Sequence, residues 1–115
     1  MKITVIGDGA WGSALATVLL RNGHEATIWG AFPDYLAEMA ATRRNPRFLP
    51  GIEFPENIRF EADMAKAVTG RELILLATPT QYLRKVLKSF KPSFDSRKQL
   101  ILNVAKGIEV ESWMR

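Results

Sequence analysis

The sequence predicts an α/β fold in which a doubly wound parallel sheet carries helices on both faces. Short apolar runs alternate along the chain with stretches of helical periodicity, which is the pattern of strands joined by right-handed helical crossovers. A glycine-rich turn, GDGAWG at residues 7–12, separates the first run from the first helical stretch. Residues 73–77 are continuously apolar, which is typical of a parallel strand buried on both faces. The length of 115 residues fits a single domain spanning residues 1–115.

The first strand is predicted at residues 1–6, where β-branched residues are frequent. After the turn, apolar side chains recur at helical spacing: Trp11, Ala14, Leu15, Val18 and Leu19. We expect this stripe to pack against the sheet. Gly23 ends the helix and leaves His24 in a surface turn.

The middle of the chain contains two further strands and one helix. Residues 25–29 read as a strand and residues 33–42 as a helix with Pro33 in its first turn. Residues 43–57 contain three prolines and a glycine, and we expect them to form a long irregular loop. Residues 58–60 are a candidate short strand.

The last third repeats the alternation. Asp63 is placed to cap a helix that runs to residue 68, and the apolar strand at residues 73–77 follows. The next helix has an apolar stripe of Leu83, Val86, Leu87 and Phe90. A further strand, expected to be buried, covers residues 99–103.

The spacing Gly7-x-Gly9-x-x-Gly12, placed between a strand and a helix, predicts a dinucleotide-binding turn. Gly7 allows the tight turn, Gly9 lets the main chain approach a pyrophosphate, and Gly12 lets the helix lie close to the strand. The helix N-terminus then presents free N–H groups to the phosphates. A glycine-rich turn without a ligand is the structural alternative.

The end of the second strand carries neither of the usual signals for cofactor choice. An acidic residue there binds the ribose hydroxyls of NAD, and an arginine receives the 2′-phosphate of NADP. Residues 29–32 are Trp-Gly-Ala-Phe, so both cofactors remain open. Arg43 and Arg44 are candidates to reach a 2′-phosphate from the following loop.

Composition excludes several kinds of site. The chain has no cysteine and one histidine, which excludes disulfides, a thiol nucleophile and a histidine metal cluster. The net charge of +4 comes from scattered basic residues without the aromatic interleaving of a nucleic-acid platform. No apolar stretch is long enough to cross a membrane, and we expect no membrane insertion and a cytoplasmic protein.

Three stretches together resemble the N-terminal domain of bacterial NAD(P)-dependent glycerol-3-phosphate dehydrogenase: GDGAWGSALA at residues 7–16, RRNPRFLPG at 43–51 and AKGIE at 105–109. The resemblance implies a Rossmann-like domain that binds NAD or NADP. It also implies hydride transfer between the cofactor and a phosphorylated small molecule, interconverting dihydroxyacetone phosphate and glycerol 3-phosphate for phospholipid synthesis. The family's helical C-terminal domain, with its catalytic lysine, has no counterpart in residues 1–115. We therefore expect a truncated chain, without a catalytic residue or turnover of its own, and leave a homodimer open.

The motif and the resemblance together assign these cofactor-binding candidates: Gly7, Gly9, Ala10, Trp11, Gly12, Ala31, Phe32, Phe48, Pro79 and Lys106. Ala10 replaces the serine usual in the family, so only its backbone N–H can serve. Trp11 either contacts the cofactor or packs against the sheet, and Phe48 either contacts it or packs within its loop. Lys106 matches the family lysine that reaches substrate and nicotinamide together.

Two other functions remain as alternatives. One is a related 3-hydroxyacid or ketopantoate-type dehydrogenase, against which NPRFLPG at residues 45–51 and KGIE at 106–109 argue. The other is a nucleotide-binding or nucleic-acid-binding module without chemistry, because one fold hosts many functions.

Overall fold

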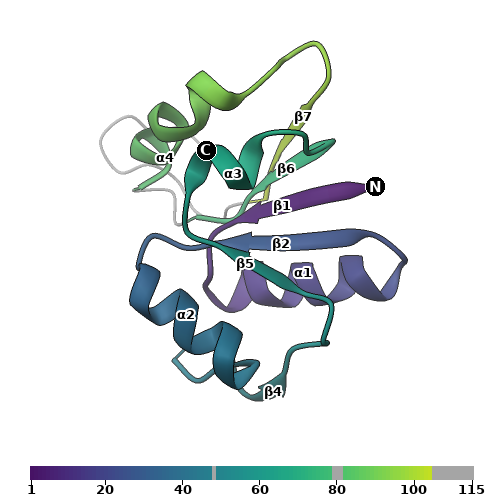
Figure 1. The fold of residues 1–115 in the computed structure, drawn as a ribbon, viewed down its shortest axis with the longest axis vertical. Helices are drawn as coiled ribbons and strands as arrows, with labels where there is room; N and C mark the ends of the chain where they lie inside the picture. Colours follow the sequence, from purple (N-terminus) through teal and green to yellow (C-terminus); the bar gives the residue numbers. More distant parts are fainter. Residues whose placement is uncertain (48, 79–81, 105–115) are drawn as a thin grey trace.

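The structure is a computed structural model that describes residues 1–47, 49–78 and 82–104. Five parallel strands of this part form one sheet in the order β5-β2-β1-β6-β7 (Figure 1). Their bounds are β1 Lys2–Ile6, β2 Glu25–Trp29, β5 Arg59–Glu61, β6 Leu73–Leu76 and β7 Leu100–Asn103. The order reverses at β1, which is the pattern of the predicted Rossmann-like, doubly wound sheet.

Helices cover both faces of the sheet (Figure 1). Helices α1 (Ala10–Arg21) and α2 (Pro33–Thr42) pack on one face, and α3 (Met64–Val68) and α4 (Leu83–Phe90) pack on the other. A short 3-10 helix, η2 (Lys91–Ser93), extends α4. The α/β class and these helices are confirmed, including the side chain of Asp63, which accepts a hydrogen bond from the Ala65 N–H at 3.0 Å as the cap of α3.

Side chains of the central strands point alternately to the two faces of the sheet, so the core consists of two clusters. Ile3 and Val5 of β1 belong to the cluster that contains Leu36 and Met39 of α2. Ile6 of the same strand belongs to the opposite cluster, with Ile74 and Leu76 of β6 and Val86 and Phe90 of α4. Each fully buried side chain of this size contributes about 1.5–3 kcal/mol, so the sheet is fixed from both sides.

The buried face of α1 differs from the predicted stripe. Trp11 and Val18 are 41% and 51% exposed. The residues that α1 buries are small: Gly12, Ser13, Ala16 and Thr17. A Cβ atom on Gly12 would lie 2.3 Å from the Gly7 carbonyl oxygen, so the helix lies too close to the sheet for large side chains to intervene. Leu19 and Leu20 are partly buried against the core further along the helix.

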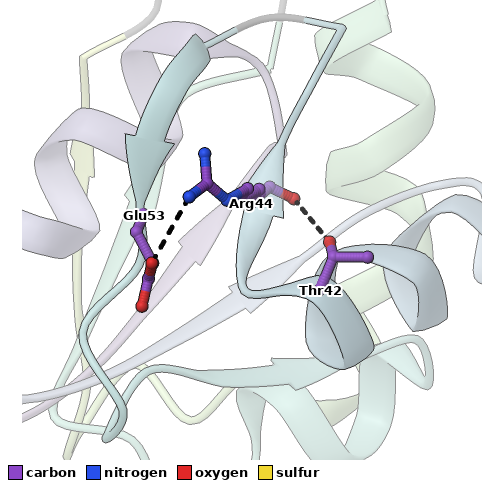
Figure 2. Close-up of polar contacts among 3 residues, drawn as sticks. All are labelled: Thr42, Arg44 and Glu53. Atoms are coloured by element: carbon purple, nitrogen blue, oxygen red, sulfur yellow. Dashed lines mark hydrogen bonds and ion pairs between the residues drawn. The ribbon is translucent and has the colours of Figure 1, made fainter.

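The segment predicted to be an irregular loop contains an antiparallel hairpin. Its strands are β3 (Arg44–Asn45) and β4 (Leu49–Glu53). Figure 2 shows the guanidinium group of Arg44 beside the Glu53 carboxylate at 3.5 Å, and the Thr42 hydroxyl donating to the Arg44 carbonyl at 3.5 Å. The ion pair is exposed and contributes little. The two strands form because their pairing satisfies backbone N–H and C=O groups that an irregular loop would leave to water.

The strand predicted at residues 99–103 is present as β7, but its side chains are not buried. Leu100 is 68% and Leu102 52% exposed, because the described residues pack against neither of its faces as they do for β6. Gln99 is buried instead, and its side-chain amide donates to the carbonyl groups of Val68 and Arg71 at 2.6 and 2.8 Å. The apolar run correctly predicted a strand, but the prediction that its side chains are buried is wrong.

Two alanine substitutions test the close approach of α1. Gly12→Ala places a Cβ against the Gly7 carbonyl, and we expect the free energy of unfolding to fall by about 1–3 kcal/mol. Gly9→Ala is the control, since a Cβ at Gly9 meets nothing within 4 Å and its φ is −72°. Its effect should stay within about 0.5 kcal/mol. Urea unfolding measures both, and equal effects would contradict the tight contact.

Candidate nucleotide-binding site

A cavity of about 730 Å³ lies at the carboxyl ends of β1, β2 and β6. These three strands end side by side, because Ile6 pairs with Trp29 on one side and with Leu76 on the other. The wall consists of Gly7, Asp8, Gly9, Ala10, Trp11, Trp29, Ala31, Phe32, Ala77, Thr78, Tyr82, Lys85, Val86 and Ser89. Its volume lies within the range of small-molecule and cofactor sites.

The glycine turn forms one wall of this cavity. Gly7 has a φ of +130°, and its N–H donates to the Trp29 carbonyl at 2.9 Å. A Cβ at Gly7 would lie 3.0 Å from the backbone of Ala77, so glycine is required both for the turn and for its packing against the end of β6. The space around the α-carbon of Gly9 is open, so its main chain is accessible.

Helix α1 begins at this turn, and no side chain caps its first N–H groups. Gly9 is the N-cap residue, and the first turn contains no acidic residue. Free N–H groups and the positive end of the helix dipole favour an anion at this position. The start of α1 is therefore suited to a phosphate group in the cavity.

Asn45 ties the hairpin to the glycine turn. It is 1% exposed, and its side-chain amide donates to the Asp8 carbonyl at 2.7 Å and to the Ser13 hydroxyl at 2.8 Å. Its side-chain oxygen accepts a hydrogen bond from the Tyr35 hydroxyl. Asn45 was not among the candidate residues, although it lies in the NPRFLPG stretch at residues 45–51; its contacts with Asp8 and Ser13 depend on the tertiary structure.

The Asp8 carboxylate lies over the residue that follows β2. A Cβ atom on Gly30 would be 2.4 Å from Asp8 Oδ2, which is buried without a hydrogen-bond partner in the described structure. Burial raises the pKa of Asp8, and a backbone hydrogen bond and the charge of Arg47 offset part of this increase. Asp8 lies within the glycine turn, but the motif pointed to the glycines and not to this carboxylate.

Trp11 joins the start of α1 to the end of β7. Its indole N–H donates to the Val104 carbonyl at 2.7 Å, while the residue lines the cavity. Trp11 does not lie under α1, where Gly12 and Ser13 are buried, but its indole contacts the sheet at the end of β7. Its contact with a cofactor remains a prediction.

Arg43 and Arg44 do not line the cavity. The Arg43 guanidinium donates to the carbonyl groups of Pro55 and Ile58 and lies 5.3 Å from the Phe60 ring centroid. Arg44 pairs with Glu53. Neither guanidinium group lies in the cavity wall, so contact of Arg43 or Arg44 with a 2′-phosphate stays a prediction.

The remaining candidates divide into two groups. Ala10, Ala31 and Phe32 lie in the cavity wall, as expected for the start of α1 and the end of β2. Phe48, Pro79 and Lys106 lie outside the described residues.

The described residues contain neither a metal-ligating cluster of side chains nor a membrane-spanning helix. No group of three or more histidine or acidic side chains in this part of the chain is placed to hold a metal ion. None of the helices of residues 1–47, 49–78 and 82–104 has the length and apolar character needed to cross a membrane.

Comparison with known proteins gives consistent matches. The family described as the N-terminus of NAD-dependent glycerol-3-phosphate dehydrogenase matches residues 2–115. The glycerol-3-phosphate dehydrogenase (NAD(P)+) of Chlorobium phaeobacteroides strain BS1 is 41% identical over 115 residues, which cover 100% of this chain and 34% of the relative. That of Geobacter sp. strain M21 is 42% identical over 111 residues, 96% of this chain and 33% of the relative.

A solved structure agrees with these matches. Glycerol-3-phosphate dehydrogenase from Coxiella burnetii superimposes with a TM-score of 0.87 at 34% identity, covering 95% of this chain and 33% of that one. The chain thus spans about a third of the length of the relatives that it matches.

The Asn45 tether can be tested by truncation. Asn45→Ala removes three hydrogen bonds from a buried position, and we expect the free energy of unfolding to fall by about 2–4 kcal/mol. Asn22→Ala is the control, because the exposed Asn22 side chain donates one hydrogen bond, to the Val18 carbonyl, and its loss should cost about 0.5 kcal/mol. Urea unfolding of both variants provides the comparison, and similar losses would argue against the tether.

The raised pKa of Asp8 predicts a pH-dependent stability difference from Asp8→Asn. Below the ordinary pKa of 3.8, Asp8 is protonated in both folded and unfolded chains and imposes no ionisation penalty. As pH rises toward the raised folded pKa, the unfolded chain ionises first, so wild type loses stability relative to the variant. Chemical unfolding should show that the free energy of unfolding of the variant, relative to wild type, is higher at pH 7 than at pH 4. A constant difference would contradict the raised pKa.

Proposed function

The chain belongs to the NAD-dependent glycerol-3-phosphate dehydrogenase family, and we propose that it is the cofactor-binding part of an enzyme that interconverts dihydroxyacetone phosphate and glycerol 3-phosphate. The bound nicotinamide cofactor would accept or supply the hydride. The observation that carries the proposal is the uncapped start of α1 at the glycine turn, facing a cavity where β1, β2 and β6 end. A role in supplying phospholipid synthesis and a cytoplasmic location remain predictions, and the oligomeric state stays open.

The cavity residues fit a dinucleotide in three ways. The N–H groups at the start of α1, including that of Ala10, would bind the pyrophosphate, and the open space at Gly9 would admit it closely. Ala31 and Phe32 follow β2, where the adenosine end is held in folds of this type. Asn45 fixes the Asp8 carbonyl and thereby the turn, which reduces the ordering required on binding.

The substrate end of the site is assigned by resemblance to the family. We propose that Lys106 contacts the phosphorylated substrate and the nicotinamide, and that Phe48 and Pro79 contact the cofactor. A lysine ammonium near the carbonyl oxygen would stabilise the negative charge that develops as hydride arrives. The family's catalytic lysine belongs to a region without a counterpart in residues 1–115, so we assign no catalytic residue here.

The alternatives are less well supported. The match over residues 2–115 favours glycerol-3-phosphate dehydrogenase over a 3-hydroxyacid or ketopantoate-type enzyme. A nucleic-acid module would require a basic surface at its binding site, yet Lys85 is the only basic residue among the described residues that line this cavity.

Titration of NADH and NADPH fluorescence against wild type and Gly9→Val tests the proposal. A valine side chain would fill the open space at Gly9, and we expect the affinity for both cofactors to fall at least about tenfold, or 1.4 kcal/mol, without loss of fold by circular dichroism. Ala37→Val, exposed on α2 and outside the cavity wall, is the control for the introduction of a valine. Unchanged affinity in Gly9→Val would remove the turn from the site. Binding of a DNA oligonucleotide in place of NADH would support the non-enzymatic alternative.

A further inference from the structure

The usual position for cofactor choice, directly after β2, contains no acidic residue in this chain. A carboxylate lies at this position nevertheless, and it comes from the turn after β1. We propose that Asp8, from the turn after β1, takes over the role of that missing acidic residue and makes the site select NADH over NADPH. The inference rests on the proposed function, since it requires that the cavity bind a dinucleotide.

The placement of Asp8 follows from its contact with Gly30. A Cβ on Gly30 would lie 2.4 Å from Oδ2, 2.9 Å from Cγ and 3.2 Å from Cβ of Asp8. The Asp8 side chain therefore occupies the space that a side chain at residue 30 would need. Gly30 is buried at the end of β2, and the next residues, Ala31 and Phe32, line the same cavity as Asp8.

The carboxylate has acceptor capacity to offer. Asp8 lines the cavity, while its Oδ2 is buried against Gly30 without a hydrogen-bond partner in the described structure. An ionised carboxylate can only accept hydrogen bonds, so a ligand group that reaches Asp8 from the cavity must bring donors. A ribose with free 2′- and 3′-hydroxyl groups supplies two O–H donors. A 2′-phosphate at the same place would bring negative charge against the carboxylate, which is strongly unfavourable in a partly buried site.

Two cations of the described structure bear on this choice. Arg47 lies over the Tyr35 ring, 4.6 Å from its centroid, and its charge acts on Asp8. Lys85 lines the cavity from α4, on the opposite face of the sheet from α1 and α2. Arg47 is exposed and its charge is screened by solvent, whereas Asp8 is half-buried at the position of the β2 acid. The carboxylate therefore outweighs the guanidinium group in selecting the ribose.

The test compares NADH and NADPH affinities in wild type and Asp8→Asn by fluorescence titration. We expect wild type to bind NADH about 10- to 100-fold more tightly than NADPH, the range of a hydrogen bond to a charged group. Asp8→Asn keeps the size but removes the charge, and the ratio should approach unity through weaker NADH and stronger NADPH binding. Glu25→Gln, at the opposite end of β2, is the matched control and should keep the wild-type ratio. Circular dichroism checks that each variant is folded.

The outcomes separate this inference from the function on which it rests. If wild type binds neither cofactor, both are overturned. If wild type binds both and Asp8→Asn leaves the ratio unchanged, only the role of Asp8 is overturned. A preference for NADPH that disappears in Arg47→Ala would also overturn it and would assign the position to the arginine.

Discussion

The contact of Gly12 with the Gly7 carbonyl determines how the rest of the cavity is built. Because no side chain separates α1 from the end of β1, the helix begins directly over the carboxyl end of the strand. Its first N–H groups then face the region where the chain leaves β1 for one face of the sheet and leaves β6 for the other. A crevice opens at such a reversal of strand order, and the helix dipole is already directed toward it.

Polar groups complete the site in two opposite ways. Asn45 is fully buried and uses both ends of its amide, so it stabilises the turn at the cost of desolvation alone. Asp8 is half-buried with one oxygen unpartnered, and this raises its pKa at the expense of the folded state. A half-buried carboxylate with a raised pKa in a cavity wall is typical of a functional site. Asn45 of β3 thus fixes the turn from outside, while Asp8 belongs to the turn and lines the cavity.

The β3–β4 hairpin supports the glycine turn through Asn45. On its own it carries an exposed ion pair of little energetic value (Figure 2). It nevertheless brings Asn45 to the Asp8 carbonyl and Arg47 to the Tyr35 ring. A segment rich in proline and glycine thus becomes part of the cavity's support. Its conformation depends on contacts with α1 and α2 as well as on its own strand pairing.

The sequence by itself determined the elements whose pattern is local: β2, α2, the Asp63 cap, the apolar stripe of α4 and the glycine turn. Propensity, capping and periodicity act within a few residues, so they can be read directly from the chain. Tertiary structure alone decided which face of α1 is buried, that residues 43–57 contain a hairpin, and that β7 leaves its side chains exposed. It also decided the contacts of Asn45 with Ser13 and of Asp8 with Gly30. These depend on how closely separate elements approach one another, a distance that packing of the whole domain sets and that no local pattern contains.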